Sequence, residues 1–167
     1  GKHFTLLTVR NDGALRLNLK RLATEYGDRE ENANWEMHAV PADPEYCVKS
    51  DNPKEPSNHV VALEGMRIRF TRNVDKESGF VNGALAEVEY RFKDKAGNYY
   101  PGVFIAKTAS GRRILVYPLT DPRNNTDRSF FMPFTYGYAM TIRRAQGSTL
   151  ELIGLWFDHT YPPEPGD

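Results

Sequence analysis

The chain has 167 residues, enough for one domain or for one domain with a small insert. Its 40% apolar content excludes a disordered tail, and 22 basic residues balance 22 acidic ones, so charge neither favours nor excludes a nucleic-acid partner. The single cysteine, Cys47, excludes an internal disulfide and favours an intracellular setting, whether nuclear, mitochondrial or cytoplasmic. No apolar run approaches the roughly 20 residues of a spanning helix, so no membrane partner is expected.

The first elements along the chain are a strand and a helix. Residues 4–9 are apolar and rich in strand formers, and residues 11–13 break the run and offer helix-capping side chains. Apolar side chains then recur at helical spacing up to a stop at Gly27: Leu15, Leu19, Leu22 and Tyr26. A strand followed by a helix predicts the opening of an α/β unit. Residues 28–58 are polar and rich in proline, which predicts a loop with one strand at 35–40.

A different pattern follows, in which apolar and polar residues alternate along short runs. The turn residues between the runs are Gly79 and the pair Asn82-Gly83. Strands are predicted at 66–70, 86–92, 99–106, 113–117 and 129–134. Several short strands with regular turns and no helix predict a small β-barrel at residues 63–132. Beyond it, residues 139–150 are compatible with a helix, 152–157 with a buried strand, and 158–167 hold three prolines and no regular element.

Motifs of self-contained enzymes are absent from the sequence. It has no G-x-x-x-x-G-K-[ST] phosphate loop, no zinc spacing of cysteine and histidine, and no G-x-S-x-G turn. We therefore expect no metal ligands, no bound cofactor and no ATP hydrolysis from this chain alone.

The most informative run covers residues 138–150. It gathers hydroxyl, cationic and amide groups beside Gly147, and such groups contact phosphate oxygens. An ordinary amphipathic helix with solvated arginines is the alternative. The run resembles motif V, T-I-H-K-S-Q-G-x-T, of RecD- and Pif-like superfamily 1 helicases. The matching residues are Thr141, Ile142, Gln146, Gly147 and Thr149. Arg144 keeps the charge of the usual Lys, whereas Arg143 and Ala145 replace the usual His and Ser.

Two further blocks occur in the order of the same family. Residues 63–73 and 79–84 resemble its L-x-x-G-x-x-V-x-x-x-x-N and G-x-V-N-G patterns, which contain Asn73 and Asn82 here. Thr8 and Asn11, with Asn18 on the predicted helix, resemble its P-T-N and the L-N that follows. The three blocks together span about residues 5–158.

The resemblance implies an α/β fold: a partial second RecA-like domain of the P-loop NTPase type at 1–62 and 133–167, with an SH3-like β-barrel inserted at 63–132. It also implies a 5′-to-3′ DNA helicase acting in DNA repair or recombination. ATP and Mg²⁺ would bind in the whole protein, with the phosphate-loop domain before Gly1 and the arginine-finger motif after Asp167. On this interpretation, single-stranded DNA contacts are assigned to Thr141, Arg143, Arg144, Ser148, Asn73 and Asn82. Coupling to the nucleotide is assigned to Gln146 and Gly147.

Two other hypotheses stay open at this point. One is a β-barrel module that binds nucleic acid or protein and has no motor role. The other is a degenerate domain without motor activity, which the changes at Arg143 and Ala145 leave possible.

Overall fold

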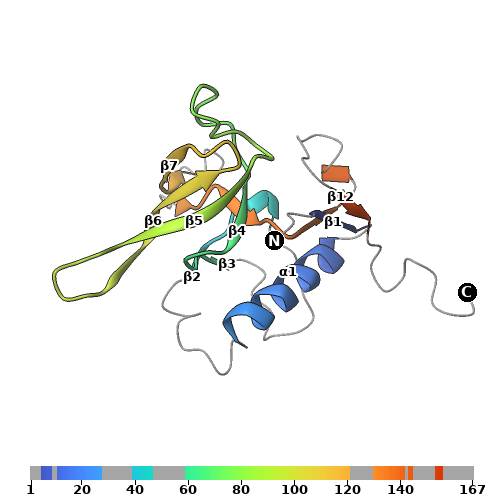
Figure 1. Ribbon diagram of the computed structural model, residues 1–167, viewed down its shortest axis with the longest axis horizontal. Helices are drawn as coiled ribbons and strands as arrows, with labels where there is room; N and C mark the ends of the chain where they lie inside the picture. The colour runs from blue at the N-terminus through green and yellow to red at the C-terminus, as the bar shows by residue number, and fades with distance from the viewer. Residues whose placement is uncertain are drawn as a thin grey trace, which may run out of the picture.

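The computed structural model describes residues 5–8, 11–27, 39–46, 59–120, 130–141, 143–144 and 153–155. A three-stranded parallel sheet lies at one end (Figure 1), with β1 (Thr5–Thr8) between β11 (Ala139–Thr141) and β12 (Ile153–Leu155). Helix α1 (Asn11–Tyr26) follows β1 and packs against β11. The predicted strand and helix are therefore confirmed as an α/β unit.

The apolar face of α1 is the one that the spacing predicts. Leu22 is fully buried, and Leu15, Leu19 and Tyr26 pack against the same core. Gly27 ends the helix with a positive φ of 83°, and its N–H donates to the carbonyl of Ala23 at 2.9 Å. Among the described residues, no helix combines the length and apolar character needed to cross a membrane.

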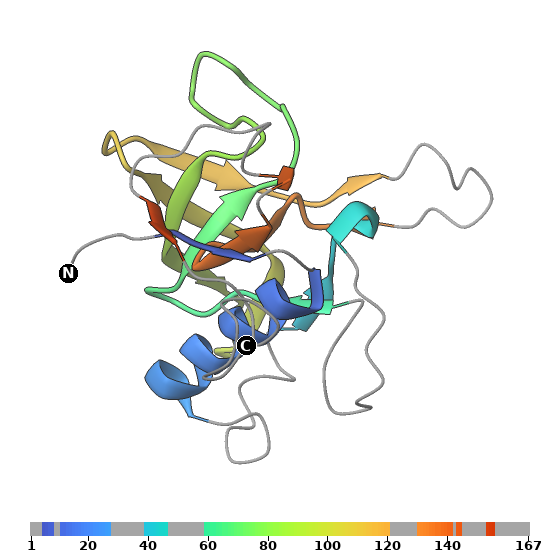
Figure 2. The same ribbon diagram turned by 90° about the vertical axis from the view of Figure 1, so that its right-hand side faces the viewer.

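An antiparallel five-stranded sheet forms the other part (Figure 2), in the order β10-β4-β5-β6-β7. Its strands are β4 (Arg67–Phe70), β5 (Leu85–Lys93), β6 (Tyr99–Thr108), β7 (Arg113–Val116) and β10 (Phe134–Tyr136). Two small ribbons pair β2 (Ala39–Pro41) with β3 (His59–Val61), and β8 (Leu119–Thr120) with β9 (Phe130–Phe131). A short 3₁₀ turn, η1, covers Pro44–Tyr46.

The predicted barrel is not closed in the described part of the chain. The edge strands β10 and β7 do not pair with each other there, and β5 and β6 project from the sheet as a long hairpin (Figure 1). Strands β4, β7 and β10 have only three or four residues each, too short to follow that hairpin. Strand β10 pairs with β4 although it lies beyond residue 132, the predicted end of the insert. The division into domains itself stays a prediction.

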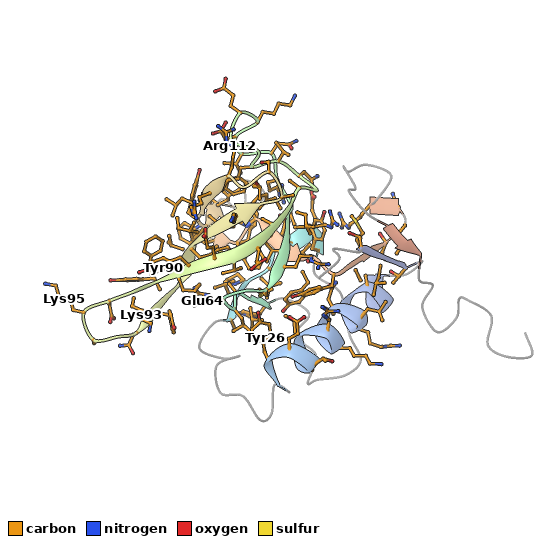
Figure 3. All side chains as sticks on the ribbon, in the orientation of Figure 1. Tyr26, Glu64, Tyr90, Lys93, Lys95 and Arg112 are labelled. Atoms are coloured by element: carbon orange, nitrogen blue, oxygen red, sulfur yellow. The ribbon has the colours of Figure 1, made fainter. Side chains whose placement is uncertain are left out.

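A β-bulge overturns part of the predicted alternation in β5. The register shifts between Val88 and Tyr90, so the strand turns its other face inward beyond this point. Tyr90 is 54% exposed and points away from the sheet (Figure 3), whereas Arg91 is 2% exposed. In β4, Arg69 is also buried, where alternation places it in solvent.

The helix expected over 139–150 does not begin at 139, because residues 139–141 form β11. All three side chains of β11 are buried, and its pairing with β1 outweighs local helix propensity. Residues 143 and 144 have helical backbone, and the Arg144 N–H donates to the Thr141 hydroxyl at 3.3 Å, the geometry of a helix cap. The strand expected at 35–40 is observed only at its end, as part of β2; residues 35–38 lie outside the described part.

Asn18 joins α1 to the start of β11. It is 4% exposed, and its Oδ1 accepts from the N–H groups of Tyr138 and Ala139 at 3.0 and 2.8 Å. Its Nδ2 donates to the carbonyls of Ala139 and Ala14, both at 2.9 Å. One side chain thus satisfies three buried backbone groups of the segment that leads to Thr141.

Asp43 holds η1 against the five-stranded sheet. Its side chain is fully buried, and it accepts two 2.8 Å hydrogen bonds from the Arg72 guanidinium and one of 3.0 Å from the Glu45 N–H. Burial by itself would raise the pKa of this carboxyl, but the bonds from Arg72 and Glu45 outweigh it, and the pKa lies below its usual value.

We expect Asn18→Ala to lower the free energy of unfolding by at least about 2 kcal/mol, because buried backbone groups lose their partners. Urea denaturation measures the change, with Lys20→Ala on the exposed face of α1 as the control. A loss no larger than that of the control would contradict the assigned role.

We expect Asp43→Asn to lower the free energy of unfolding at neutral pH by about 2 kcal/mol. The folded pKa is depressed, so the carboxylate stabilises the fold fully above the unfolded-state pKa of about 4 and stops doing so as the pH falls through the folded pKa. The difference from the wild type should therefore shrink in acid. Glu45→Gln is the control, since Glu45 is exposed and lies 4.0 Å from Arg72. A difference that does not change with pH would refute the explanation.

Candidate nucleic-acid interface

A pocket of about 530 Å³ lies where the two sheets meet, and we call it the two-sheet pocket. One wall comes from the five-stranded sheet, with Arg69, Phe70, Thr135 and the turn at Asn82-Gly83. The other comes from β11 and the residues after it, namely Met140, Thr141, Arg143 and Arg144, while Glu45 and Tyr46 of η1 close one side. The pocket therefore combines residues that are far apart in the sequence.

The pocket brings together four of the residues predicted from the sequence: Asn82, Thr141, Arg143 and Arg144. Asn73 lies behind the turn and supports it, because its side-chain Oδ1 accepts from the Asn82 N–H at 2.9 Å. Gly83 has a φ of 91°, and its N–H donates to the Phe70 carbonyl at 2.8 Å. The Asn82-Gly83 pair thus both closes a turn and lines the pocket. Gln146, Gly147 and Ser148 lie outside the described residues.

Arg143 is the predicted cation that is most available to a ligand. It is exposed at the pocket wall, and within the described part of the chain its guanidinium forms no hydrogen bond or ion pair. Thr141 is buried and its hydroxyl accepts from the Arg144 N–H, but the O–H can still donate to an oxygen in the pocket.

Arg144 is already held by the protein. Its guanidinium carbon lies 3.7 Å from the centre of the Tyr46 ring, and its Nη2 donates to the Glu45 carbonyl. Burial raises the pKa of Tyr46, and the nearby Arg144 only partly opposes the rise. Arg144 therefore fastens η1 to the segment after β11, a role that the sequence pattern did not indicate.

Arg69 is a pocket residue that sequence reasoning missed. Although it is 3% exposed, it lines the pocket, and it donates to the Gly83 carbonyl at 2.8 Å and to the Thr5 hydroxyl. It brings a positive charge to the pocket and joins β4 to β1. Alternation along 66–70 placed it in solvent, and no local signal indicates otherwise. Glu45 and Tyr46 were missed because they belong to the predicted loop.

Other candidates for nucleic-acid contact have different surroundings. Exposed aromatic side chains can stack on bases, and here Tyr100 and Phe130 are exposed, whereas Phe131 is buried. Arg113 could contact phosphate through its charge, but it donates two hydrogen bonds to the Glu89 carboxylate, which raises the pKa of Arg113 and balances its charge.

Comparison with known proteins places the fold. No model of a protein family and no curated protein matches the chain. Among solved structures, unliganded Pif1 from Bacteroides sp matches 97% of this chain and 36% of its own, with a TM-score of 0.59 and 20% identity. Pif1 helicase from Candida albicans matches 93% of this chain and 39% of its own, with a TM-score of 0.57 and 17% identity.

A third structure, described as two coordinating Pif1 helicases unwinding forked double-stranded DNA, matches 92% of this chain and 32% of its own. Its TM-score is 0.56 and its identity 20%. These matches confirm the predicted resemblance to Pif-like helicases at the level of fold. The likeness to RecD and the SH3-like insert stay predictions. The chain has the fold of a part of Pif1 helicases that amounts to about a third of their length.

Proposed function

We propose that this chain is a motor segment of an ATP-dependent DNA helicase and that the two-sheet pocket binds the backbone of single-stranded DNA. The observation that carries the proposal is the convergence of Arg69, Arg143 and Arg144 on one pocket with the Thr141 hydroxyl and the Asn82 amide. Guanidinium, hydroxyl and amide groups are the usual partners of phosphate oxygens. Contacts of this kind carry no sequence preference and weaken with salt.

The fold likeness favours a motor segment over an isolated binding module. The matches to Pif1 cover 92 to 97% of the chain, so they include both sheets and not the antiparallel sheet alone. A module that bound through the antiparallel sheet would have no need for the parallel sheet or for the arginines after β11. Binding to single-stranded DNA, 5′-to-3′ movement and work in repair or recombination belong to this proposal.

We propose nucleotide binding for the whole protein and not for the described residues alone. The sequence has no phosphate loop, and in the described part of the chain no three His, Cys, Asp or Glu side chains gather in a way that fits a metal ion. We therefore assign the described residues no step of hydrolysis. Coupling through Gln146 and Gly147 stays part of the proposal, as does a first RecA-like domain of the whole protein that carries the phosphate loop and completes the ATP site.

We expect Arg143→Ala to weaken binding of single-stranded DNA and to lower the slope of log affinity against log salt by about 0.7, the value for one lost phosphate contact. Fluorescence anisotropy of a labelled oligothymidine over a salt series measures both. Lys95→Ala is the matched control, because it removes one positive charge at the exposed tip of the β5–β6 hairpin (Figure 3). Equal effects of the two variants, or an unchanged slope for Arg143→Ala, would overturn the site.

We expect Arg144→Lys to weaken binding nearly as much as Arg144→Ala does, although only the first keeps the charge. A lysine ammonium cannot reproduce the planar stacking of the guanidinium on Tyr46, so either change releases η1 from the segment after β11. The same anisotropy titration measures the three proteins side by side. If the lysine variant bound like the wild type, charge alone would explain Arg144.

A further inference from the structure

The two sheets that form the pocket are joined by a connection of two residues, Gly137 and Tyr138. Strand β10 ends at Tyr136, which pairs with Ile68 in the antiparallel sheet. Strand β11 begins at Ala139, which pairs with Leu6 in the parallel sheet. The chain therefore passes from one pocket wall to the other with almost no slack, and the surroundings of these two residues control how the walls meet.

Gly137 allows the connection to lie directly against β4. Its N–H donates to the Arg67 carbonyl at 3.0 Å. A Cβ at this position would lie 2.8 Å from Arg67 Cγ and from the Ile68 carbonyl carbon, and 2.9 Å from the Ile68 nitrogen. Backbone atoms cannot move aside as a flexible side chain can, so any larger residue would push the connection away from β4.

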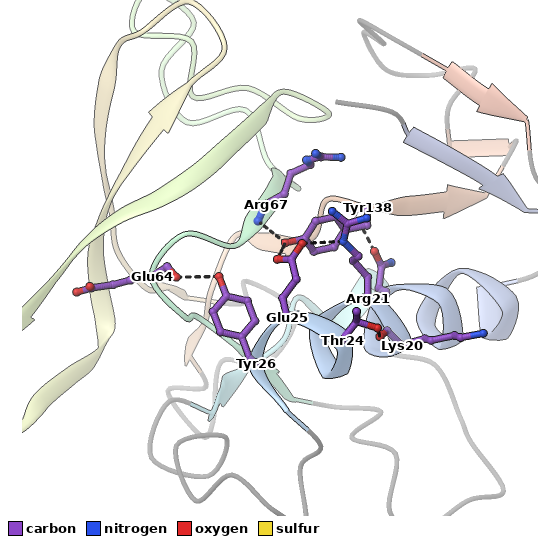
Figure 4. A network of polar contacts seen from close by, with 9 residues as sticks. Lys20, Arg21, Thr24, Glu25, Tyr26, Glu64, Arg67 and Tyr138 are labelled. Atoms are coloured by element: carbon purple, nitrogen blue, oxygen red, sulfur yellow. Dashed lines mark hydrogen bonds and ion pairs between the residues drawn. The ribbon is translucent and has the colours of Figure 1, made fainter. Parts of the chain in front are cut away.

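Tyr138 is held from three directions (Figure 4). Its N–H donates to Asn18 Oδ1 at 3.0 Å, and its carbonyl accepts from the Leu6 N–H at 2.9 Å. Its hydroxyl accepts from the Arg67 N–H at 3.1 Å and lies 3.5 Å from Glu25 Oε2. The guanidinium carbons of Arg21 and Arg67 lie 5.4 and 5.0 Å from the ring centre, so the ring contacts one cation from α1 and one from β4.

A second contact joins α1 to the antiparallel sheet near the start of β4. The Tyr26 hydroxyl, at the end of α1, donates to the Glu64 carbonyl just before β4 at 2.8 Å (Figure 4). Burial, with smaller contributions from Tyr138 and Glu25, raises the pKa of Tyr26 to about 12. The hydroxyl therefore keeps its proton, and this donor is present at physiological pH.

We propose that Gly137 and Tyr138 are positioning residues of the two-sheet pocket, because they set the spacing between the wall with Asn82 and the wall with Thr141 and Arg143. The inference rests on the proposed function, in which those walls grip one strand of DNA. Neither residue lines the pocket, so each acts through the groups that do. The contacts of Tyr138 keep the walls at the spacing that the phosphate contacts need.

The spacing can be measured directly by electron spin resonance. Spin labels at Lys20→Cys on α1 and Lys107→Cys on β6 occupy exposed positions on the two sides of the connection, in a Cys47→Ser background. We expect a narrow distance distribution with Tyr138 and with Tyr138→Phe, and a broad or shifted one with Tyr138→Ala and with Gly137→Ala. Tyr90→Ala, exposed on β5, is the control and should leave the distribution unchanged.

Binding tests the consequence for the pocket. We expect Tyr138→Ala to weaken single-strand binding about tenfold, the scale of losing two cation–ring contacts, and to leave the salt slope unchanged because no phosphate contact is removed. Tyr138→Phe keeps the ring and should restore most of the affinity. If Tyr138→Ala does not fold, Arg67→Met replaces it, since it removes one of the two cations and keeps the backbone N–H that bonds the Tyr138 hydroxyl.

The outcomes separate the two proposals. An unchanged distance distribution and affinity in folded Tyr138→Ala, or in Arg67→Met where that variant replaces it, would overturn the positioning role while Arg143→Ala still weakens binding. A normal affinity and salt slope in Arg143→Ala would overturn the DNA site itself, whatever the labels report. A loss of affinity in Tyr138→Phe as large as in Tyr138→Ala would also count against the role of the ring.

Discussion

The need to satisfy buried backbone groups at the start of β11 shapes the rest of the molecule. Helix α1 lies beside Tyr138 and Ala139. Its own backbone groups are bonded within the helix, so they cannot bond the backbone of a neighbouring strand. Asn18 fills this gap, since its amide offers both an acceptor and donors on one side chain. The helix, the parallel sheet and the connection to the antiparallel sheet are thus fixed to one another at one point, and Thr141 follows it by two residues.

Buried arginines extend this fixing across the antiparallel sheet. Arg69 bonds β1 through the Thr5 hydroxyl, and Arg91 bonds the carbonyls of Ala62 and Tyr100. Burial lowers the pKa of Arg91, but an arginine pKa starts so high that the group stays charged. A buried charge is costly without partners, so such arginines tie their partners to one arrangement. In β5 the bulge turns Arg91 inward to these carbonyls, and the same shift of register leaves Tyr90 exposed.

The sequence predicted those features that local patterns encode. Leucine spacing predicted α1, the Asn82-Gly83 pair predicted a turn, and the run at 138–150 predicted that Thr141, Arg143 and Arg144 belong to one site. It could not predict the inward turn of Arg69 and Arg91, because a bulge and the buried hydrogen-bond partners of an arginine depend on residues far along the chain. The stacking of Arg144 on Tyr46 was hidden for the same reason: 97 intervening positions separate them, and one of the pair lay in a stretch with loop composition. A closed barrel was predicted wrongly because an alternating pattern identifies strands but does not show whether the edge strands of the sheet pair with each other.

The fold likeness to Pif1 helicases at 17 to 20% identity is consistent with a structure in which backbone groups take part in several of the contacts that join the two sheets. The Asn18 side chain bonds backbone groups of β11 and the connection, and the Tyr138 hydroxyl bonds the backbone N–H of Arg67. Gly137 lies directly against the backbone of β4 because it has no side chain. Contacts of this type constrain few side chains, so most other positions can change without moving the two sheets apart. The pocket then inherits its shape from the backbone and its chemistry from a few exposed side chains. A change of side chain at the wall, such as one at Arg143, therefore alters the chemistry of the pocket and leaves the wall in place.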